Sequence, residues 1–324
     1  MKKIYLIAPS FGCTTSPYKE RLDKALKTLK KLGFEYIIGK NVYLNNGIAS
    51  SNTPELRAIE FINAYKSDAD IIWSVGGGEV MCEILEYIDF NELKKYKPKL
   101  FIGYSDNTNL TYTLTTHLDI ETIYGINAPS LYQTPLKYSE KEMIDLLNGK
   151  KEFYGFKSFQ LYDHKDELFP KLILNKRKII TAYNYTKPFK GIMLGGCLDC
   201  LSILCGTKFD NTVEYINKKN DKLIFYLEAC DLTSIGIRRA LFQLKNAGWF
   251  KNVSGFVIGR SLNYYDNSFG TTPIDSYIDI LGSLNVPLLI NCDLGHIPPT
   301  LPFKNGVKAT VKYVDKNINI IYEK

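Results

Sequence analysis

The sequence is poor in histidine and tryptophan, with three and two of them among its 324 residues. It also lacks an apolar run of the ~20 residues that a membrane helix needs, so we expect no membrane partner. The scarcity of histidine limits the possible chemistry, because histidine is the usual base for a nucleophilic serine. Any such site must use His117, His164 or His296.

The amino-terminal segment has a basic start, Lys2-Lys3, and a short apolar stretch that ends at Pro9. The apolar region of a secretory signal is longer than this stretch. The stretch leads directly into a loop and an expected helix, which favours a first core strand. We therefore expect a cytoplasmic protein.

The seven cysteines are an odd number and lie mostly in apolar segments. This distribution favours reduced, buried thiols over a disulfide framework. Cys197 and Cys200 have the spacing of half a zinc or redox site, but no second pair or histidine lies near them in the sequence. We interpret both as core residues at a helix start and expect no metal.

The formal net charge of +7 raises the question of nucleic-acid binding. The lysines are scattered along expected helices and connections, as on solvated helix faces. The sequence shows no basic stripe interleaved with aromatic residues, no zinc-finger spacing and no RNA-binding signature. We expect no nucleic-acid partner.

Residues 1–130 alternate between apolar segments and amphipathic helical patterns. The expected strands cover residues 4–8, 35–38, 71–75 and 100–102, and a helical pattern follows each of them. Such alternation is typical of a parallel, doubly wound α/β sheet whose active crevice lies beyond the carboxyl ends of the strands. We predict that residues 1–130 form such a domain.

The regular alternation is lost over residues 131–190, which we interpret as a linker with partial structure. It resumes afterwards with expected strands, two helical patterns and a closing hairpin over 307–314 and 318–322. The expected strands there are 191–194, 223–227, 255–259 and 286–290. Residues 191–324 are predicted to form a mixed, strand-rich second domain.

Ser105 follows an expected strand that ends at Gly103, and a helical pattern begins directly after it. This is the setting of a nucleophile elbow, in which a serine hydroxyl is exposed at the end of a sheet strand. Asn107 stands where the usual Gly-x-Ser-x-Gly pattern has its second glycine. Ser105 is our candidate nucleophile.

The glycine triplet Gly76 to Gly78 follows another expected strand. Its free amides would suit a phosphate, but the spacing matches neither common nucleotide-binding pattern. One amide of the triplet and the amide of Asp106 would also suit the negative oxygen that forms when a serine attacks a carbonyl. A phosphate site, an oxyanion hole and a simple tight turn all remain open.

Several motifs occur in a recognisable order along nearly the whole chain. They are the glycine triplet, Gly103-Tyr104-Ser105-Asp106, Gly195-Gly196, Tyr226-Leu227-Glu228, Gly295-His296 and Leu301-Pro302. In these motifs the chain resembles the LD-carboxypeptidase family of serine peptidases, which includes the microcin C self-immunity proteins.

The resemblance implies a Rossmann-like amino-terminal domain and a carboxy-terminal domain with barrel-like strands. It also implies a triad across the cleft between them: Ser105 as nucleophile, His296 as general base and Glu228 orienting the imidazole. For the oxyanion hole that the residues themselves suggest, we take the amides of Gly77 and Asp106, and which glycine of Gly76 to Gly78 supplies its amide stays open. A homodimer is a further implication, and the chemistry requires no metal or organic cofactor.

Some residues depart from the family pattern. The family often has an acidic residue where this chain has Ala229, and a small residue or asparagine where it has Cys197. In the family a glycine often follows the proline of the last motif closely, but here Phe303 follows Pro302. These differences put the substrate in doubt more than the chemistry.

The residues themselves leave alternatives open. Glu228 closes an apolar strand, where a carboxylate needs a partner, and that partner could be its own loop, Arg238 or Arg239 instead of a histidine. His296 could be a structural histidine in a proline-rich turn. His117 and His164 are weaker base candidates, because one lies in the helix after Ser105 and the other in the linker.

The resemblance implies one of two substrates. One is a cell-wall tetrapeptide that loses its terminal D-alanine at the L,D bond, and the other is a peptidyl or aminoacyl nucleotide with an amide link. The second use is associated with a linker aromatic that stacks on adenine, often tryptophan. The linker here has no tryptophan and offers Tyr154, Phe156, Tyr162, Tyr183 and Tyr185. We favour the muropeptide, and a binding protein without turnover remains an alternative of another class.

Overall fold

The computed structural model describes residues 2–161 and 167–323. The chain divides into two compact units. The first unit is Met1–Met143 with Tyr162–Lys171, and the second unit is Ile144–Leu161 with Leu172–Lys324. Two residues considered in the sequence, Tyr162 and His164, lie outside the described residues.

The first unit contains a parallel sheet with the strand order β5-β4-β3-β1-β2. The strands are β1 (Lys3–Ile7), β2 (Glu35–Ile38), β3 (Ile71–Ser74), β4 (Leu100–Gly103) and β5 (Thr122–Tyr124). Their order reverses at β1 and β3, which is the topological switch point where doubly wound sheets bind ligands. The predicted doubly wound sheet is confirmed.

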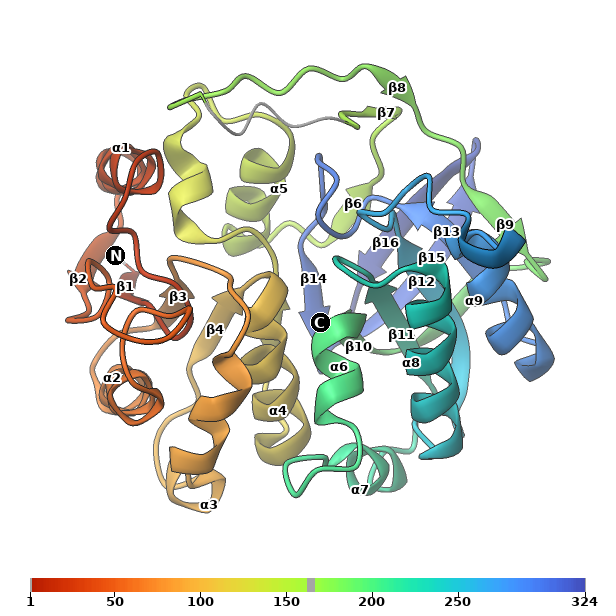
Figure 1. Ribbon diagram of the computed structural model, residues 1–324, viewed down its shortest axis with the longest axis horizontal. Coiled ribbons are helices and arrows are strands. Elements are labelled where there is room, and N and C mark those ends of the chain that lie inside the picture. The colour runs from red at the N-terminus through yellow and green to blue at the C-terminus, as the bar shows by residue number, and fades with distance from the viewer. Residues whose placement is uncertain (1, 162–166, 324) are drawn as a thin grey trace. The chain divides into compact units, whose positions relative to one another are not determined.

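Helices connect these strands in the first unit (Figure 1). They are α1 (Tyr18–Lys31), α2 (Pro54–Lys66), α3 (Phe90–Leu93) and α4 (Thr108–Leu118), with the 3-10 turns η1 (Met81–Tyr87), η2 (Ser105–Asn107) and η3 (Ala128–Tyr132). At the start of α2, the Thr53 side chain accepts a hydrogen bond from the Leu56 amide, and Pro54 is the first residue of the helix, where it is well tolerated. The apolar periodicity after Gly78 forms the 3-10 turn η1.

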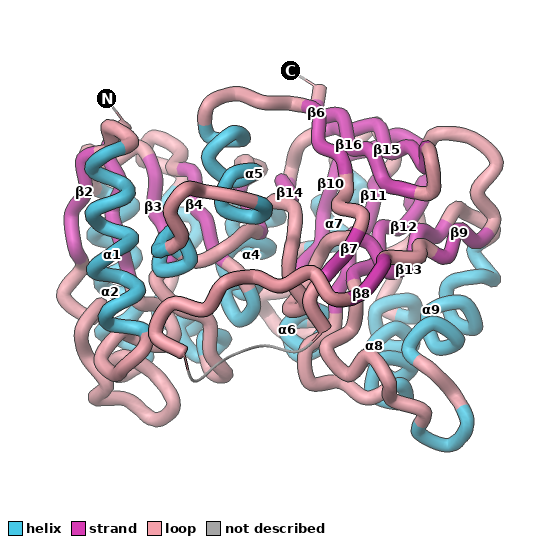
Figure 2. Tube along the Cα trace, turned by 90° about the horizontal axis from the view of Figure 1, so that it is seen from above, coloured by secondary structure: helices cyan, strands magenta, loops and turns pink. Residues whose placement is uncertain are grey.

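The second unit also contains parallel strands, in the order β10-β11-β12-β13. They are β10 (Phe189–Cys197), β11 (Leu223–Glu228), β12 (Val253–Gly259) and β13 (Leu288–Cys292). The helices of this unit are α6 (Leu198–Leu204), α7 (Thr212–Asn217), α8 (Ser234–Asn246) and α9 (Pro273–Leu281), with η4 (Ser268–Gly270) and η5 (Gly282–Leu284). Figure 2 shows α8 and α9 side by side next to the strands.

Antiparallel strands extend this sheet on both sides. The hairpin of β15 (Lys308–Val314) and β16 (Asn317–Tyr322) joins β10, and β6 (Glu152–Tyr154) pairs with β16. At the other side, β9 (Thr181–Tyr183) pairs with β13. In the described part of the chain the order ends at β6 and β9, so the mixed sheet is open and does not close into the barrel that the resemblance suggested.

Residues 131–190 are divided between the two units. They hold α5 (Tyr138–Leu147), the sheet strands β6 and β9, and the short antiparallel pair of β7 (Ser158–Phe159) and β8 (Lys176–Arg177). The strand β14 (Phe303–Asn305) follows later in the chain. Among the helices that the structure describes, none combines the length and apolar character needed to cross a membrane.

Candidate active site

Ser105 occupies a sharp turn between β4 and α4 in the first unit. Its backbone φ is +63°, in the left-handed region that residues other than glycine rarely adopt. The Ser105 amide donates a hydrogen bond to the Tyr124 hydroxyl (3.1 Å), and the Thr108 hydroxyl donates to the Ser105 carbonyl (2.8 Å). A strained serine at a strand-to-helix turn is the geometry of a nucleophile elbow.

Asn107 explains why this elbow lacks its usual second glycine. The Asn107 side-chain amide donates to the carbonyls of Gly76 and Tyr104, each at 2.8 Å, and so ties the glycine triplet to the elbow. A Cβ atom at Gly103 would lie 2.4 Å from the Asn107 Cβ atom. Position 103 therefore has to be a glycine, because any larger residue would collide with the Asn107 side chain.

Gly77 lies directly beside the candidate nucleophile. A Cβ atom at Gly77 would lie 3.1 Å from Cβ of Ser105 and 3.4 Å from its Oγ atom. The Gly77 carbonyl accepts a hydrogen bond from the Phe11 amide (3.0 Å), which fixes the loop. Of the three interpretations of the triplet, this packing favours the oxyanion hole, and that role stays a prediction.

Asp106 has a buried side chain that holds three segments of the first unit together. Its Oδ2 atom accepts hydrogen bonds from the Ser10 hydroxyl (2.6 Å) and the Met81 amide (2.9 Å), and its Oδ1 atom accepts one from Asn109 (3.0 Å). Burial raises the pKa of Asp106, and the hydrogen bonds from Ser10 and Met81 offset this only in part. The sequence had suggested a role for the Asp106 amide alone.

Glu228 and His296 form a pair within the second unit. The Nδ1 atom of His296 lies 3.0 Å from Oε2 of Glu228. Glu228 is the last residue of β11 and is fully buried, whereas 15% of the His296 side chain is exposed. Of the alternative partners for Glu228, Arg238 instead binds Asp279 at 2.5 Å.

Two glycines allow the main chain to approach Glu228 closely. A Cβ atom at Gly259 would lie 2.9 Å from the Glu228 Cβ atom, and one at Gly295 would lie 2.9 Å from Oε2. Gly295 also has a φ of +103°, which glycine adopts without a steric penalty. The glycine of the Gly295-His296 motif is therefore needed to bring the imidazole to the carboxylate.

The surroundings of His296 favour its protonated form. Burial lowers the pKa of the imidazole, but the charge of Glu228 and the hydrogen bonds to Cys230 and Glu228 outweigh burial and raise the pKa well above 6.5. Burial also raises the pKa of the Cys230 thiol, and His296 reduces this rise. The contact with Cys230 was not predicted; its only sequence signal is a position two residues after Glu228 at the end of β11.

Asp199 gives the Cys197-Cys200 motif its structural role. Its carboxylate accepts hydrogen bonds from the amides of Cys230 (3.0 Å), Asp231 (2.8 Å) and Leu232 (3.2 Å), the segment that follows Glu228. Cys197 is buried at the start of α6. Over residues 2–161 and 167–323, no group of three or more His, Cys, Asp or Glu side chains is placed to hold a metal ion.

The structure thus groups the predicted site residues within each unit. Ser105, Gly77 and Asp106 lie together in the first unit, and Glu228 and His296 in the second. His117 packs its ring against Phe90, with ring centroids 4.3 Å apart, which is a structural role.

Comparison with known families gives a consistent result. The model of the LD-carboxypeptidase N-terminal domain matches residues 4–125, and that of the LD-carboxypeptidase C-terminal domain matches residues 190–311. The chain belongs to the LD-carboxypeptidase family. The Ser105 elbow lies in the first matched segment, and Glu228 and His296 lie in the second.

Similar proteins in this family carry two kinds of name. The microcin C7 self-immunity protein MccF of Escherichia coli is 26% identical over 313 residues, with 93% of this chain and 88% of that protein covered. A probable murein peptide carboxypeptidase of Bacillus subtilis is 25% identical over 317 residues, with 96% and 89% covered. A solved structure of MccF in complex with aspartyl sulfamoyl adenosine has a TM-score of 0.82 at 22% identity and covers 100% of this chain and 96% of its own. The structural match supports the two-domain α/β fold.

Proposed function

We propose that this member of the LD-carboxypeptidase family is a serine-type carboxypeptidase that hydrolyses the L,D amide bond of cell-wall muropeptides and releases the terminal D-alanine. The observation that carries the proposal is the hydrogen-bonded pair of His296 and buried Glu228, at 3.0 Å. A buried carboxylate that binds one imidazole nitrogen is the arrangement that prepares a histidine for proton transfer through the other nitrogen. The strained turn at Ser105 supports the assignment of the nucleophile.

In the proposed mechanism Ser105 attacks the carbonyl carbon of the scissile amide, and His296 accepts the hydroxyl proton on Nε2. The imidazolium then passes this proton to the leaving amine, so that the C–N bond breaks and an acyl-serine ester remains. Water, deprotonated by His296, hydrolyses the ester and restores Ser105. The charge of Glu228 stabilises the imidazolium in both steps.

The amides of Gly77 and Asp106 would bind the oxyanion. Gly77 packs against Ser105, and the side-chain hydrogen bonds of Asp106 fix its backbone at the elbow. Donors fixed before the reaction stabilise the charge that develops on the carbonyl oxygen, and losing one typically costs about 100 to 1,000-fold in kcat. The assignment thus gives the glycine triplet a catalytic role.

The experiment that tests the substrate uses two compounds separately. The protein is incubated with an L-Ala-D-Glu-diaminopimelate-D-Ala tetrapeptide and with aspartyl sulfamoyl adenosine, and the products are identified by mass. We expect loss of D-alanine from the tetrapeptide, and none with Ser105→Ala or His296→Gln. Normal turnover by Ser105→Ala would refute the serine mechanism.

A second candidate is hydrolysis of an aminoacyl or peptidyl nucleotide. It is favoured by the likeness to MccF, one of whose solved structures holds aspartyl sulfamoyl adenosine. Tyr154 in β6, with 60% of its surface exposed, is an aromatic of residues 131–190 that could stack on a base. Cleavage of the sulfamoyl compound alone would select this candidate.

Binding of either compound without turnover, and no covalent labelling of Ser105 by a serine-directed probe, would instead select a binding protein. We also propose a homodimer from the family resemblance, which light scattering of the purified protein tests.

A further inference from the structure

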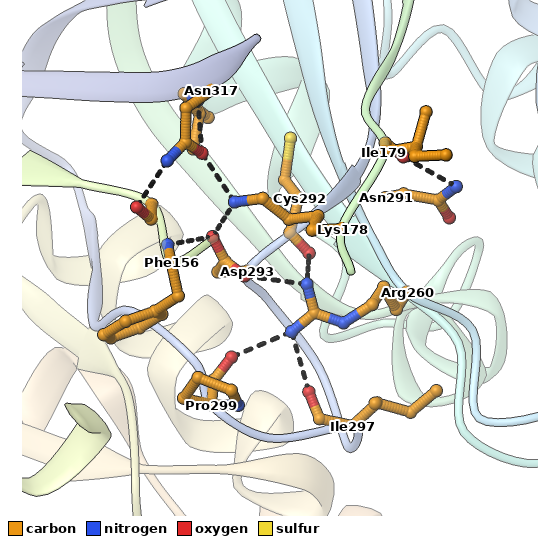
Figure 3. A network of polar contacts seen from close by, with 12 residues as sticks. Phe156, Lys178, Ile179, Arg260, Asn291, Cys292, Asp293, Ile297, Pro299 and Asn317 are labelled. Atoms are coloured by element: carbon orange, nitrogen blue, oxygen red, sulfur yellow. Dashed lines mark hydrogen bonds and ion pairs between the residues drawn. The ribbon is translucent and has the colours of Figure 1, made fainter. Parts of the chain in front are cut away.

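One buried arginine binds the main-chain carbonyls of Cys292, Ile297 and Pro299 (Figure 3), which come before and after His296 in the sequence. Arg260, which follows β12, is fully buried. Its Nη2 atom donates to the carbonyls of Ile297 (2.9 Å) and Pro299 (2.8 Å). Its Nη1 atom donates to the carbonyl of Cys292 (3.2 Å). The guanidinium therefore binds the chain at both ends of the loop 293–299, at Cys292 just before it and at Pro299, its last residue.

Asp293 fixes the guanidinium in place. Its Oδ1 atom lies 2.7 Å from Nη1 of Arg260, and both side chains are fully buried. Its Oδ2 atom accepts hydrogen bonds from the Phe156 amide (2.8 Å) and from Lys178, which also donates to Asn317 (2.6 Å). A buried charge is tolerated only with partners of this kind, so the ion pairs hold Arg260 in a single orientation.

Further contacts fix the backbone of the loop 293–299 near the Arg260 guanidinium. The Gln160 amide donates to the Pro298 carbonyl (2.9 Å), between the two carbonyls that Arg260 binds. The Arg260 amide donates to the Leu294 carbonyl (3.2 Å), and the Phe159 ring lies 4.8 Å from the guanidinium carbon. The backbone on each side of His296 is therefore fixed by groups outside the loop.

We propose that Arg260 is a positioning residue for His296, which holds the imidazole against Glu228 by binding the backbone carbonyls before and after it. The inference rests on the proposed function in taking His296 as the base. The planar fork of arginine presents two terminal nitrogens that donate to separate acceptors at fixed angles, whereas a lysine ammonium offers a single nitrogen at the end of a flexible stem. Positioning His296 therefore requires the shape of the guanidinium, and a positive charge alone does not suffice.

The test compares two substitutions with a matched control. Arg260→Lys keeps a positive charge beside Asp293 and loses the fork, and Arg260→Met removes the charge as well. Lys99→Met is the control, because Lys99 is also a buried cation that binds backbone carbonyls, those of Ser67 (2.8 Å) and Ala69 (2.5 Å), but lies in the first unit at the edge opposite Ser105. The imidazole NMR signals of the three histidines are titrated in each protein, with His296 assigned through His296→Gln.

We expect both Arg260 variants to lower the titration midpoint of His296 by roughly half a unit or more, because the imidazole moves away from Glu228. We expect kcat to fall on the order of 10-fold or more with little change in KM, because misplacing a reacting group slows the step without weakening binding. Lys99→Met should change neither quantity, even where it lowers the thermal midpoint.

If Arg260→Lys had the same His296 titration midpoint and the same kcat as the wild type, the proposal would be overturned. If Arg260→Met does not fold, Arg260→Lys alone tests the proposal. The NMR titration needs no substrate. If neither test compound is hydrolysed, or Ser105→Ala remains active, the proposed function fails while the position of His296 is still measured.

Discussion

His296 contacts Glu228 through Nδ1 at 3.0 Å, at a point where Gly295 and Gly259 leave no side chain in the way. Glu228 is fully buried, where a carboxylate needs partners, so this contact contributes to its stabilisation. The imidazole gains a raised pKa from the same contact. The pair therefore links the chemistry of the site to the folding of the second unit.

The first prediction concerns the pH dependence of activity in Glu228→Gln. The base must be neutral, so kcat/KM should rise with pH through the raised pKa of His296, with a midpoint above 6.5. Removing the carboxylate charge should shift this acid limb to lower pH. It should also lower kcat by roughly 1,000 to 10,000-fold. A pH-rate profile of both proteins checks this, and an unshifted limb would contradict the role of Glu228.

The second prediction separates the chemistry of Ser105 from its backbone strain. Ser105→Ala and Ser105→Gly should both lose hydrolysis, but only glycine relieves the φ of +63°. Glycine should therefore make the protein more stable than alanine by about 1 kcal/mol, despite its greater flexibility when unfolded. Urea unfolding of the two variants measures the difference. Equal stability would show that the elbow is not strained.

The third prediction concerns Gly77→Ala, whose new methyl group would lie 3.4 Å from the Ser105 hydroxyl oxygen. We expect kcat to fall by about 100-fold as the oxyanion donor and the nucleophile are forced apart, with only a small change in stability. Gly236→Ala is the control, because its methyl group meets side-chain atoms of Leu232, at a similar 3.1 Å, and of Thr233, at 3.6 Å, far from Ser105 in the sequence. Unchanged kcat in Gly77→Ala would remove Gly77 from the proposed oxyanion hole.

Much of this arrangement could be predicted from local sequence. The strand before Ser105 and the strand that ends in Glu228 are apolar runs with clear ends, so the sequence predicts where both candidate residues lie relative to these strands. The resemblance to the family then suggested the pair with His296. Apolar runs in the sequence are therefore sufficient to predict candidate residues that lie at or just after the end of a strand.

Other features depend on partners far away in the chain. β6 and β9 are three-residue strands that exist because they pair with β16 and β13, about 165 and 107 positions later, counted between the paired residues Tyr154 and Asn319 and the paired residues Ala182 and Leu289. Arg260 has no local signal either, since its carbonyl acceptors lie more than 30 residues away. Such contacts are set by tertiary packing and cannot be predicted from periodicity or propensity.

The fourth prediction concerns Gly295→Ala. An added methyl group would lie 2.9 Å from Oε2 of Glu228, at a φ of +103°. The backbone strain should cost about 1–2 kcal/mol, and the displaced imidazole should lower kcat by roughly 100-fold. Gly206→Ala shares a positive φ (+83°) but meets no atom within 4 Å, so it should lose stability and keep its activity. Equal activities of the two variants would contradict the close approach at Gly295.

The last prediction concerns stability and pH. Glu140 is buried in α5, and burial raises its pKa from 4.5 to about 7. The unfolded chain ionises near 4.5, while the folded protein keeps the proton up to about pH 7. Unfolding therefore releases a proton between these values, and the carboxyl makes the folded state less stable as the pH rises through this window. Glu140→Gln removes the ionisation and should increase stability at pH 8 by about 1–3 kcal/mol, with little effect at pH 4.

Urea unfolding at both pH values measures this effect, followed by the fluorescence of Trp73, which is buried in the first unit with Glu140. A Trp249→Phe background removes the signal of the second unit. Glu55→Gln, at an exposed position in the first turn of α2, is the control and should show no comparable gain at pH 8. Because the expected gain arises only where the carboxylate is charged, an equal gain at pH 4 and pH 8 would mean that improved packing, and not the buried charge, stabilises the variant.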